Sequence, residues 1–482
     1  MLTNELLNGY RPDNNTWDEM YETGAVRQQY SGVVDFLQHL SMEELGKKEE
    51  QAKRLFMTQG ITFTVYNSGE GIEKIFPFDI IPRIITAAEW NYIEKGIQQR
   101  LKALNLFLKD VYNEQFIIKD GLVPLSIIYS CPHFLREMVR FPVPYDIYVH
   151  IAGIDLIRDN DGTFYVLEDN LRTPSGVSYM LENREITKRI FPDLLPLINV
   201  RSVMEYPNIL HKNLVSMAPR QNSNPTVVLL SPGIYNSAYF EHTTLARMMG
   251  IELVEGRDLV VDNHRVYMKT TAGLQQVDVI YRRVDDDFLD PLVFNASSAL
   301  GVSGIMSAYR KGNVAIVNAV GNGVADDKAI YSYVPAMIRY YLNEEPLLKN
   351  VPTYQLGNPE EQEYVFKNMN NMVIKKTNES GGYGMLMGHT ASDKEISDYQ
   401  AVILKDPRQF IAQPTISLSS APCYMNGKLQ PRRVDLRPYA LCGPNGIRIV
   451  PGGLTRVALR EGSLVVNSSQ GGGSKDTWVL TV

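Results

Sequence analysis

Two short apolar runs between residues 151 and 170 flank the dipeptide Asp161-Gly162. Asp-Gly between two such runs is the strongest short signal for a tight β-hairpin. If these two residues form the loop, paired positions along the strands sum to a constant, and Asp155 lies directly opposite Glu168. A four-residue loop would keep this parity, whereas a three-residue loop would break it.

The same pairing places three oxygen-bearing side chains on one face of the predicted hairpin. Side chains alternate faces with a period of two, so Asp155, Glu168 and Asn170 point the same way. Two carboxylates directly opposite each other repel unless a cation lies between them. Hard oxygen ligands of this kind suit Mg²⁺ that also holds nucleotide phosphates. The alternatives are an exposed polar face or one acid that stays protonated.

Apolar periodicity predicts helices on both sides of this hairpin. Residues 1 to about 60 have a helical pattern with a charged, solvated face at residues 43–54, and short strands are predicted at 60–66 and 74–82. A capping box of Thr86 and Glu89 begins one long helix. Its apolar stripe comprises Ile93, Ile97, Leu101, Leu104, Leu108 and Val111. On that helix, Arg100 and Asp110 are expected at the surface. Another helix is predicted at 177–191.

A change of composition at residues 218–225 indicates a linker. Beyond it, an apolar strand, a helix and further strands predict a Rossmann-like α/β domain over about 225–305. Its Ser-Pro-Gly turn lacks the spacing of a dinucleotide fingerprint. Arg282 and Arg283 end a strand of this domain, where α/β folds present ligand-binding groups. From about residue 310 onward, helices and strands mix in an α+β pattern.

A glycine-rich loop follows the predicted strand at residues 372–376. Alternation places Lys375 and Lys376 on opposite faces, so that one of them can point inward to a phosphate. Gly381, Gly382 and Gly384 would let the backbone approach phosphates and donate N–H groups to them. The alternative is a plain glycine-rich turn with a chance lysine beside it.

Other polar clusters carry weaker signals. Asp286 and Asp287 are expected in a solvated turn, and Glu241-His242 is expected to cap its own helix rather than to act in catalysis. The segment at residues 467–478 contains Gly-Gly-Gly-Ser-Lys475 but does not match a P-loop, so a surface loop is expected there, with a flexible substrate or phosphate loop as the alternative.

Bulk composition excludes several classes of protein. A chain of 482 residues suits about three domains of roughly 150 residues. The net charge of -6 gives no electrostatic case for binding nucleic acid or an anionic membrane. Three scattered cysteines form neither a disulfide framework nor a zinc site. Neither a signal peptide nor a long apolar span is present, so a cytoplasmic location is expected.

Together these stretches resemble a circularly permuted ATP-grasp enzyme, close to the proteins described as glutathionylspermidine synthase-like. The resemblance implies an α+β fold with α/β parts that holds Mg-ATP between two subdomains, together with a Rossmann-like domain and an N-terminal helical segment. Expected boundaries are 1–80 for the N-terminal segment, 81–215 for the hairpin part, 225–305 for the Rossmann-like domain and 306–482 for the part that carries the lysines.

The resemblance also implies roles for individual residues. Glu168 and Asn170 in Leu-Glu-Asp-Asn correspond to the metal-binding Glu-x-Asn pair, and Asp155 matches the acid on the preceding strand. Lys328 corresponds to the first ATP lysine. The second lysine and its loop correspond to Lys376, Gly381, Gly382 and Gly384, because the family lysine precedes the first loop glycine by five residues. Gln413 corresponds to the strand that lines the adenine pocket.

The chain departs from glutathionylspermidine synthetases at Arg172, where those proteins have an acid before Thr-Pro, and at Gly153, where they have arginine. A polyamine would need carboxylates, whereas Arg172 at a helix start favours an anion. The resemblance therefore implies an ATP- and Mg²⁺-dependent carboxylate–amine ligase that acts on a peptide or amino-acid-like carboxylate and an amine. Arg172, Arg282 or Arg283 would hold the carboxylate. The alternatives are a small-molecule kinase, a non-catalytic ATP-binding protein or a scaffold protein.

Overall fold

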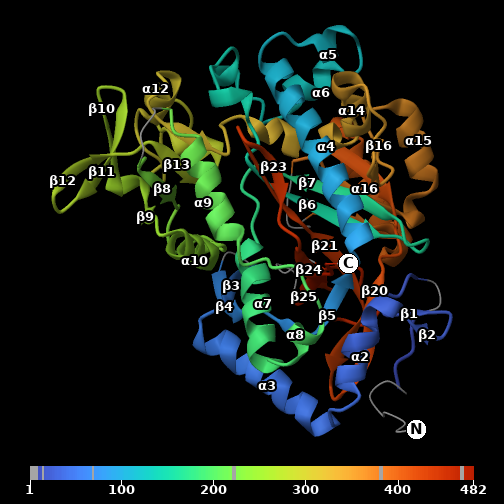
Figure 1. Ribbon diagram of the computed structural model, residues 1–482. Coiled ribbons are helices and arrows are strands. Elements are labelled where there is room, and N and C mark those ends of the chain that lie inside the picture. The colour runs from blue at the N-terminus through green and yellow to red at the C-terminus, as the bar shows by residue number, and fades with distance from the viewer. Residues whose placement is uncertain are drawn as a thin grey trace.

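A large mixed sheet carries the predicted hairpin and lies at the centre of the molecule (Figure 1). The computed structural model describes residues 9–13, 16–67, 70–219, 224–378, 384–466 and 472–481. The strands follow the order β15-β7-β6-β21-β24-β25-β5, with β20 beside β21 and β22 between β6 and β23. Their bounds are β5 (Phe78–Ile85), β6 (Ile151–Arg158), β7 (Phe164–Asn170), β15 (Lys349–Asn350), β20 (Ser420–Met425), β21 (Lys428–Arg437), β22 (Tyr439–Gly443), β23 (Gly446–Ile449), β24 (Leu454–Val457) and β25 (Gly473–Val479).

Helix α4 (Ala87–Tyr112) covers one face of this sheet and runs through the middle of Figure 1. Its predicted capping box is present: Glu89 N–H donates to Thr86 Oγ1 at 3.2 Å, and Thr86 N–H donates to a Glu89 carboxylate oxygen at 2.8 Å. All six residues of the predicted apolar stripe are fully buried. The expectation that Arg100 and Asp110 lie at the surface is wrong. Arg100 pairs with Asp169 on β7, and Asp110 accepts hydrogen bonds from two backbone amides of α5 (Phe116–Lys119).

A second, parallel sheet lies beside the first, with the strand order β14-β13-β8-β9. It belongs to the predicted Rossmann-like part, at the left of Figure 1. Its last strand, β14, lies beyond residue 305, so this sheet continues past the expected boundary. Its elements are α9 (Tyr206–Ser216), β8 (Val227–Leu230), α10 (Tyr239–Met249), β9 (Glu252–Val254), β13 (Val279–Arg282), α11 (Asp286–Leu289), α12 (Ile305–Arg310) and β14 (Ala315–Val317), and a small sheet of β10 (Leu259–Asp262), β11 (Arg265–Thr270) and β12 (Gly273–Gln276) extends from it.

A smaller antiparallel sheet with the order β16-β19-β17-β18 has its own apolar core. Its elements are β16 (Tyr354–Gln355), α15 (Pro359–Lys367), β17 (Met372–Lys376), β18 (Leu386–Met387), α16 (Asp393–Ile403) and β19 (Phe410–Pro414). Helices that connect these layers are α6 (Leu125–Ser130), α7 (Val177–Ile190), α8 (Leu194–Leu197), α13 (Lys328–Tyr331) and α14 (Val334–Leu342). Helix α7 packs against β24 and β25.

The N-terminal segment contains more than the helices that its pattern predicts. Before α2 (Ser31–Leu37) and α3 (Met42–Thr58), residues 16–27 form a strap that includes the short strands β1 (Tyr21–Glu22) and β2 (Ala25–Val26). The hairpin of β3 (Thr62–Asn67) and β4 (Glu70–Ile75) follows.

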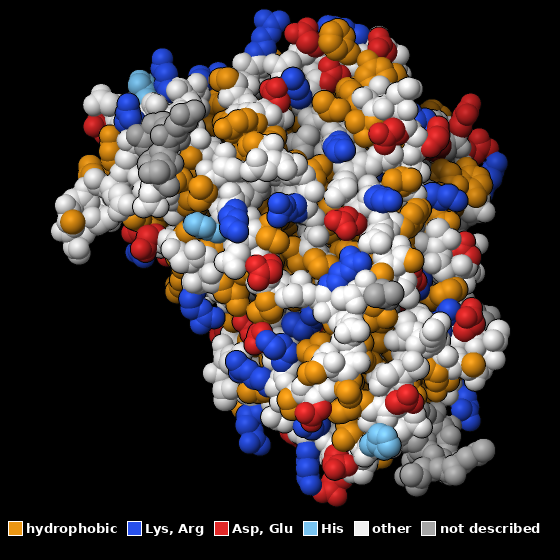
Figure 2. Space-filling view, viewed as in Figure 1, with side chains coloured by type: hydrophobic (Ala, Val, Ile, Leu, Met, Phe, Trp, Pro, Cys, Tyr) orange, Lys and Arg blue, Asp and Glu red, His pale blue; other side chains and the backbone are white. Residues whose placement is uncertain are grey.

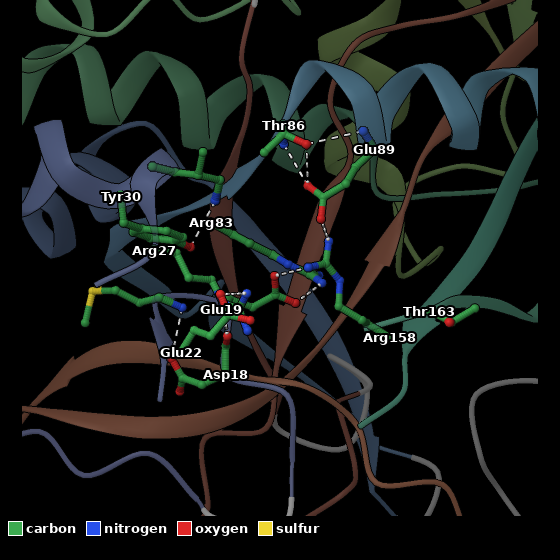
Figure 3. Close-up of polar contacts among 12 residues, drawn as sticks. Asp18, Glu19, Glu22, Arg27, Tyr30, Arg83, Thr86, Glu89, Arg158 and Thr163 are labelled. Atoms are coloured by element: carbon green, nitrogen blue, oxygen red, sulfur yellow. Dashed lines mark hydrogen bonds and ion pairs between the residues drawn. The ribbon is translucent and has the colours of Figure 1, made fainter. Parts of the chain in front are cut away.

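Glu19 of this strap is buried between two arginines of the central sheet (Figure 3). Its carboxylate lies 2.6 Å from an Arg83 nitrogen and 3.3 Å from an Arg158 nitrogen. Arg158 also pairs with Glu89 at 2.7 Å. Since Arg158 ends β6, the strap is fixed directly to the strand that carries Asp155.

The described part of the glycine-rich stretch near the C-terminus, from residue 472 onward, is not the expected surface loop, and residues 467–471 lie outside the described residues. Gly473–Val479 form β25, which is buried between β24 and β5. Lys475 is fully buried and pairs with Asp79. A buried lysine requires such a partner, because an unpaired charge inside the protein is very costly.

Among the described residues, no helix is both long and apolar enough to span a bilayer. On the face shown in Figure 2, Lys and Arg side chains are interspersed with Asp and Glu. This mixture agrees with the modest net charge of -6.

Candidate active site

A cleft of about 500 Å³ lies between the central sheet and the smaller sheet of β16 to β19. Its size falls in the range of small-molecule and cofactor sites. Strands β6, β7, β21 and β24 contribute its floor, and β17, β19 and the start of α13 contribute the opposite wall. The predicted residues that line it are Asp155, Glu168, Asn170, Arg172, Lys328, Lys376 and Gln413. Residues far apart in the sequence thus meet in one cavity.

The predicted pairing of Asp155 with Glu168 is confirmed, although the predicted two-residue loop is wrong. Arg158 pairs with Phe164, and the Asp159 amide donates to the Thr163 carbonyl at 3.0 Å, which leaves three residues in the loop. A bulge between the loop and Asp155 inserts one extra residue in β7. The three-residue loop shifts the pairing by one residue and the bulge shifts it back. Asp155, Glu168 and Asn170 therefore still share one face.

The floor of the cleft joins these acids to a pair of arginines that sequence reasoning did not single out. Arg437 donates to both carboxylate oxygens of Asp155, at 2.5 and 2.9 Å, and Arg456 donates to Asp155 at 2.7 Å. Arg456 also pairs with Asp435. Burial raises the pKa of Asp155, but the two guanidiniums outweigh burial and hold that pKa well below its usual range.

The strand register explains why these charges meet. Leu436 pairs with Leu156, so Arg437 lies beside Asp155 on the neighbouring strand. Asp435 pairs with Arg456 across β21 and β24 and lies on the same face. The alternation of each strand was visible in the sequence, but the pairing of β6 with β21, about 280 residues later, was not.

The donor set fits a divalent cation in part. Glu168 and Asn170 lie two residues apart on β7 and both line the cleft. Asn170 Nδ2 is buried and has no hydrogen-bond partner among the described residues. Both oxygens of Asp155, in contrast, accept from guanidiniums, and the described residues contain no cluster of three acidic, histidine or cysteine ligands. Glu168 and Asn170 are therefore the residues best placed to hold Mg²⁺, and Asp155 is not available in this arrangement.

Lys328 contacts the hairpin face that carries Glu168 and Asn170. Its Nζ is 2.9 Å from Glu168 Oε1, and the side chain is largely buried. Two aspartates before it hold it there: Asp326 accepts from the Leu171 amide at 2.6 Å, and Asp327 caps α13. The Lys328 amide donates to the Thr377 carbonyl at 3.1 Å, which brings this lysine to the end of β17.

Lys375 and Lys376 both line the cleft from β17. Lys375 Nζ donates to Gln413 Oε1 at 2.8 Å. Val373 pairs with Gln413, so Lys375, two residues later, shares the face of Gln413. Burial lowers the pKa of Lys375 to about 8, and Lys328 contributes to this shift while Glu168 opposes it. Lys375, the alternative to Lys376 on this strand, thus lies close enough to Glu168 and Lys328 for their charges to affect its pKa.

The glycine-rich loop is described only at its end. Gly381 and Gly382 lie outside the described residues. Gly384 has a φ of +65°, a left-handed conformation that glycine adopts without strain.

Arg172 lines the cleft but does not offer a free guanidinium. Its Nε donates to Asp326 at 2.9 Å, and a second nitrogen lies 3.9 Å from Asp285. The helix start beside it is also occupied. Glu241 of α10 accepts from the amides of Gly176 and Ser178 at 2.7 and 3.1 Å. The expected anion site at the start of α7 is therefore filled by a carboxylate of the protein, and Glu241 caps α7 rather than its own helix.

Arg282 and Arg283 are buried and are absent from the residues that line the cleft. Arg282 donates to the carbonyls of Asn318 and Val284 and pairs with Asp286 at 2.8 Å. Arg283 donates to the Pro174 carbonyl at 2.7 Å and pairs with Glu241.

These contacts position the Rossmann-like sheet against the cleft. They also correct the expectation that Asp286 lies in a solvated turn, since it is buried, whereas Asp287 is exposed.

A cleft with an Mg²⁺-suited acid–amide pair opposite several lysines is the site of an ATP-grasp protein. The chain belongs to the circularly permuted ATP-grasp type 2 family, which matches residues 82–458. The expected fold class is confirmed by this match and by the architecture.

Proteins of Synechocystis sp. and Mycobacterium tuberculosis are similar over almost the whole chain. The first is 53% identical over 98% of each chain, and the second is 51% identical over 96% of this chain and 84% of its own. A Frankia casuarinae protein, provisionally named glutamate–cysteine ligase 2-2, is 42% identical. It matches 98% of this chain, which spans 54% of the Frankia protein.

Among solved structures, a glutathione synthetase-like effector from Globodera pallida superposes with a TM-score of 0.61 at 9% identity. The match covers 92% of this chain and 98% of the effector, and it shows a shared fold. The narrower resemblance to glutathionylspermidine synthase-like proteins stays a prediction.

The Glu168→Gln variant tests the metal-binding assignment. We expect Mg-ATP turnover to be lost, while the free energy of unfolding changes by less than about 1 kcal/mol, because loss of the pair with Lys328 is offset by removal of a like charge beside Asp155 and Asp169. Urea unfolding and an ADP-release assay measure the two quantities. Glu363→Gln on α15 is the matched control, since it also breaks a glutamate–lysine pair but lies at the surface. Unchanged turnover in Glu168→Gln would refute the assignment.

Proposed function

We propose that this protein is an ATP- and Mg²⁺-dependent carboxylate–amine ligase that works through an acyl phosphate. The observation that carries the proposal is the content of one cleft. Lys328 pairs with Glu168, Lys375 and Lys376 line the opposite wall, Asn170 lines the floor, and an arginine pair lies on the adjoining strands. Phosphoryl transfer depends on positioning and charge neutralisation more than on covalent protein chemistry, so this array supplies what the reaction needs.

Each part of the cleft has a role in this reaction. The lysines neutralise phosphate charge. Gln413 and the apolar residues around it, including Val351, Val373 and Met387, form a pocket for the base. Glu168 and Asn170 would hold Mg²⁺, and the bound ion would supply positive charge to neutralise the charge that develops on the transferred phosphoryl group.

In the proposed reaction, a carboxylate oxygen of the substrate attacks the γ-phosphorus, the bond to the β–γ bridging oxygen breaks, and ADP leaves. The amine nitrogen then attacks the acyl carbon, inorganic phosphate leaves, and the amine loses a proton to solvent.

Arg437 and Arg456 take the place that sequence reasoning gave to Arg282 and Arg283. Both line the cleft and share Asp155 as their partner. A guanidinium binds a carboxylate or a phosphoryl group with two parallel hydrogen bonds. Their donors are paired with Asp155, Asp435 and the Ser175 carbonyl in this structure, so Arg437 and Arg456 would hold the substrate carboxylate by exchanging part of the pairing with Asp155 for it. Arg172 pairs with Asp326, two residues before Lys328, and would position this wall of the cleft.

The proposal is tested by ADP release with amino acids, short peptides and polyamines, together with mass spectrometry of the product. An amide product formed with one ADP for each bond supports the ligase. A stable phosphorylated product would show a kinase instead. Failure to bind Mg-ATP would refute both enzymes.

The lowered pKa of Lys375 predicts that the protein takes up a proton when ATP binds. With a pKa of about 8 in the free protein, Lys375 is largely neutral at pH 9. ATP phosphates favour its charged form, so binding should take up a proton and the affinity should fall as pH rises above 8. Titration calorimetry in buffers of different ionisation enthalpy measures this uptake. Lys375→Met should abolish it, and an identical uptake in that variant would assign the proton to another group.

A further inference from the structure

The cleft continues beyond its charged floor to an apolar end that has no role in the proposed binding of ATP. We call it the aromatic end, and it comprises Phe63, Phe76, Tyr179, Ser237, Ala238 and Leu454. The order of the strands gives its place. The lysines face Glu168 on β7, Asp155 and Arg437 follow on β6 and β21, and Leu454 lies on β24, the next strand.

The aromatic end adjoins the arginine pair directly. Leu454 pairs with Arg437 across β21 and β24, so the two side chains are neighbours on one face. Arg437 also donates to the Ser175 carbonyl at 3.3 Å, just before the helix that carries Tyr179. A carboxylate held by Arg437 would thus have its attached group directed toward Leu454 and Tyr179.

The rings of this end are held rigidly. Phe76 stacks on Tyr179 with ring centroids 4.0 Å apart, and Phe63 meets Phe76 edge-on at 5.5 Å. The Tyr179 hydroxyl donates to the Thr62 carbonyl at 2.8 Å, which orients the ring. Phe240, two residues after Ala238, also stacks with Tyr179, with ring centroids 5.7 Å apart. Preorganised rings of this kind bind apolar groups without a further ordering cost.

None of the described residues of the aromatic end carries a charge. A polyamine or a glutamate side chain placed there would lose hydration without gaining a charged partner, which is unfavourable. An aromatic or branched aliphatic side chain would instead bury apolar surface against three rings and a leucine.

We infer that the substrate carboxylate belongs to an amino acid or peptide C-terminus whose side chain is apolar, and that the aromatic end selects this side chain. The inference rests on the proposed ligase function and adds the substrate class. It places the reacting carboxylate at Arg437 and the specificity determinants at Tyr179, Phe76 and Ala238.

Capture of the acyl phosphate by hydroxylamine tests the inference without knowledge of the natural amine. The hydroxylamine nitrogen attacks the acyl carbon, phosphate leaves and a hydroxamate forms. Phenylalanine, leucine, alanine and glutamate are compared, both free and as the C-terminal residue of alanyl dipeptides, with the full chain and Mg-ATP. We expect kcat/KM for phenylalanine or leucine to exceed that for alanine and glutamate by about tenfold or more.

Two variants that fill the aromatic end sharpen the test. Ala238→Phe, or Ser237→Leu if the first does not fold, should lower kcat/KM for phenylalanine relative to alanine by about tenfold. The Kd for ATP should not change. Ile234→Phe on the same loop is the control, because Ile234 is 63% exposed and does not line the cleft.

The outcomes separate this inference from the proposed function. Hydroxamate formed equally well or better from alanine or glutamate would overturn the apolar selection and leave the ligase intact. An unchanged preference in both filling variants would do the same. Hydroxamate from no carboxylate, although ATP binds, would refute the ligase itself.

Discussion

The Lys328→Met variant is expected to lose at least about a hundredfold in ATP-dependent turnover, since removing one preorganised charge donor at a transition state typically costs that much. Lys328 is largely buried and lies 2.9 Å from Glu168, at the point where the phosphates and the metal would meet. Methionine keeps the length and apolar stem of the side chain and removes only the charge. ADP release measures the turnover, and calorimetry measures the Kd for ATP.

The exposed Lys367 on α15 provides the matched control, because Lys367→Met also breaks a lysine–glutamate pair. Lys375→Met and Lys376→Met complete the series. If the contact with Gln413 marks the phosphate lysine, Lys375→Met should lose more ATP affinity than Lys376→Met. If the spacing to the glycine loop marks it, Lys376→Met should lose more. If Lys328→Met turned over ATP like the parent, Lys328 would lie outside the phosphate site.

The Glu19→Ala variant is expected to lose about 3 to 5 kcal/mol of unfolding free energy, because breaking a buried ion pair leaves uncompensated charge. Arg83 and Arg158 are both nearly inaccessible, and Glu19 is the carboxylate that lies between them (Figure 3). Arg158 would keep its pair with Glu89, whereas Arg83 would keep only its bond to the Asp435 carbonyl. Urea unfolding measures the loss.

Glu22→Ala in the same strap is the control, because Glu22 is well exposed in its pair with Arg27 and should change stability by less than about 1 kcal/mol. A small loss in Glu19→Ala would show that the strap contributes little to the fold. The strap also packs on the hairpin of β6 and β7. Gly162 has a φ of +82°, and a Cβ there would lie 2.5 Å from the Trp17 ring.

Local patterns predicted the elements well where each pattern is complete within one segment. The capping box at Thr86 and the stripe of α4 need only nearest neighbours, and both are present. The Asp155–Glu168 pairing was also correct, although by the cancellation of a three-residue loop and a bulge. Neither irregularity leaves a signal that period-two alternation can detect.

The missed residues share one physical cause. Arg100, Arg456 and Lys475 are buried, and Arg437 is largely buried, against partners on strands far away in the sequence. A charged residue in a sequence predicts exposure by default, and only the pairing of strands supplies the opposite charge. For Arg282 and Arg283 the opposite happened. They lie at the end of a strand as expected, but their guanidiniums donate to backbone carbonyls instead of lining the cleft. Sequence patterns thus located the cleft, while strand topology decided which side chains face it.

Transfer of ¹⁸O from the substrate carboxylate to inorganic phosphate tests the central claim most directly. When a carboxylate labelled at both oxygens forms an acyl phosphate and an amine displaces the phosphate, one carboxylate oxygen leaves on phosphorus. The ligase account predicts that every phosphate released with amide product carries one ¹⁸O atom, as measured by mass spectrometry. Unlabelled phosphate, or a label retained in a stable phosphorylated product, would contradict it.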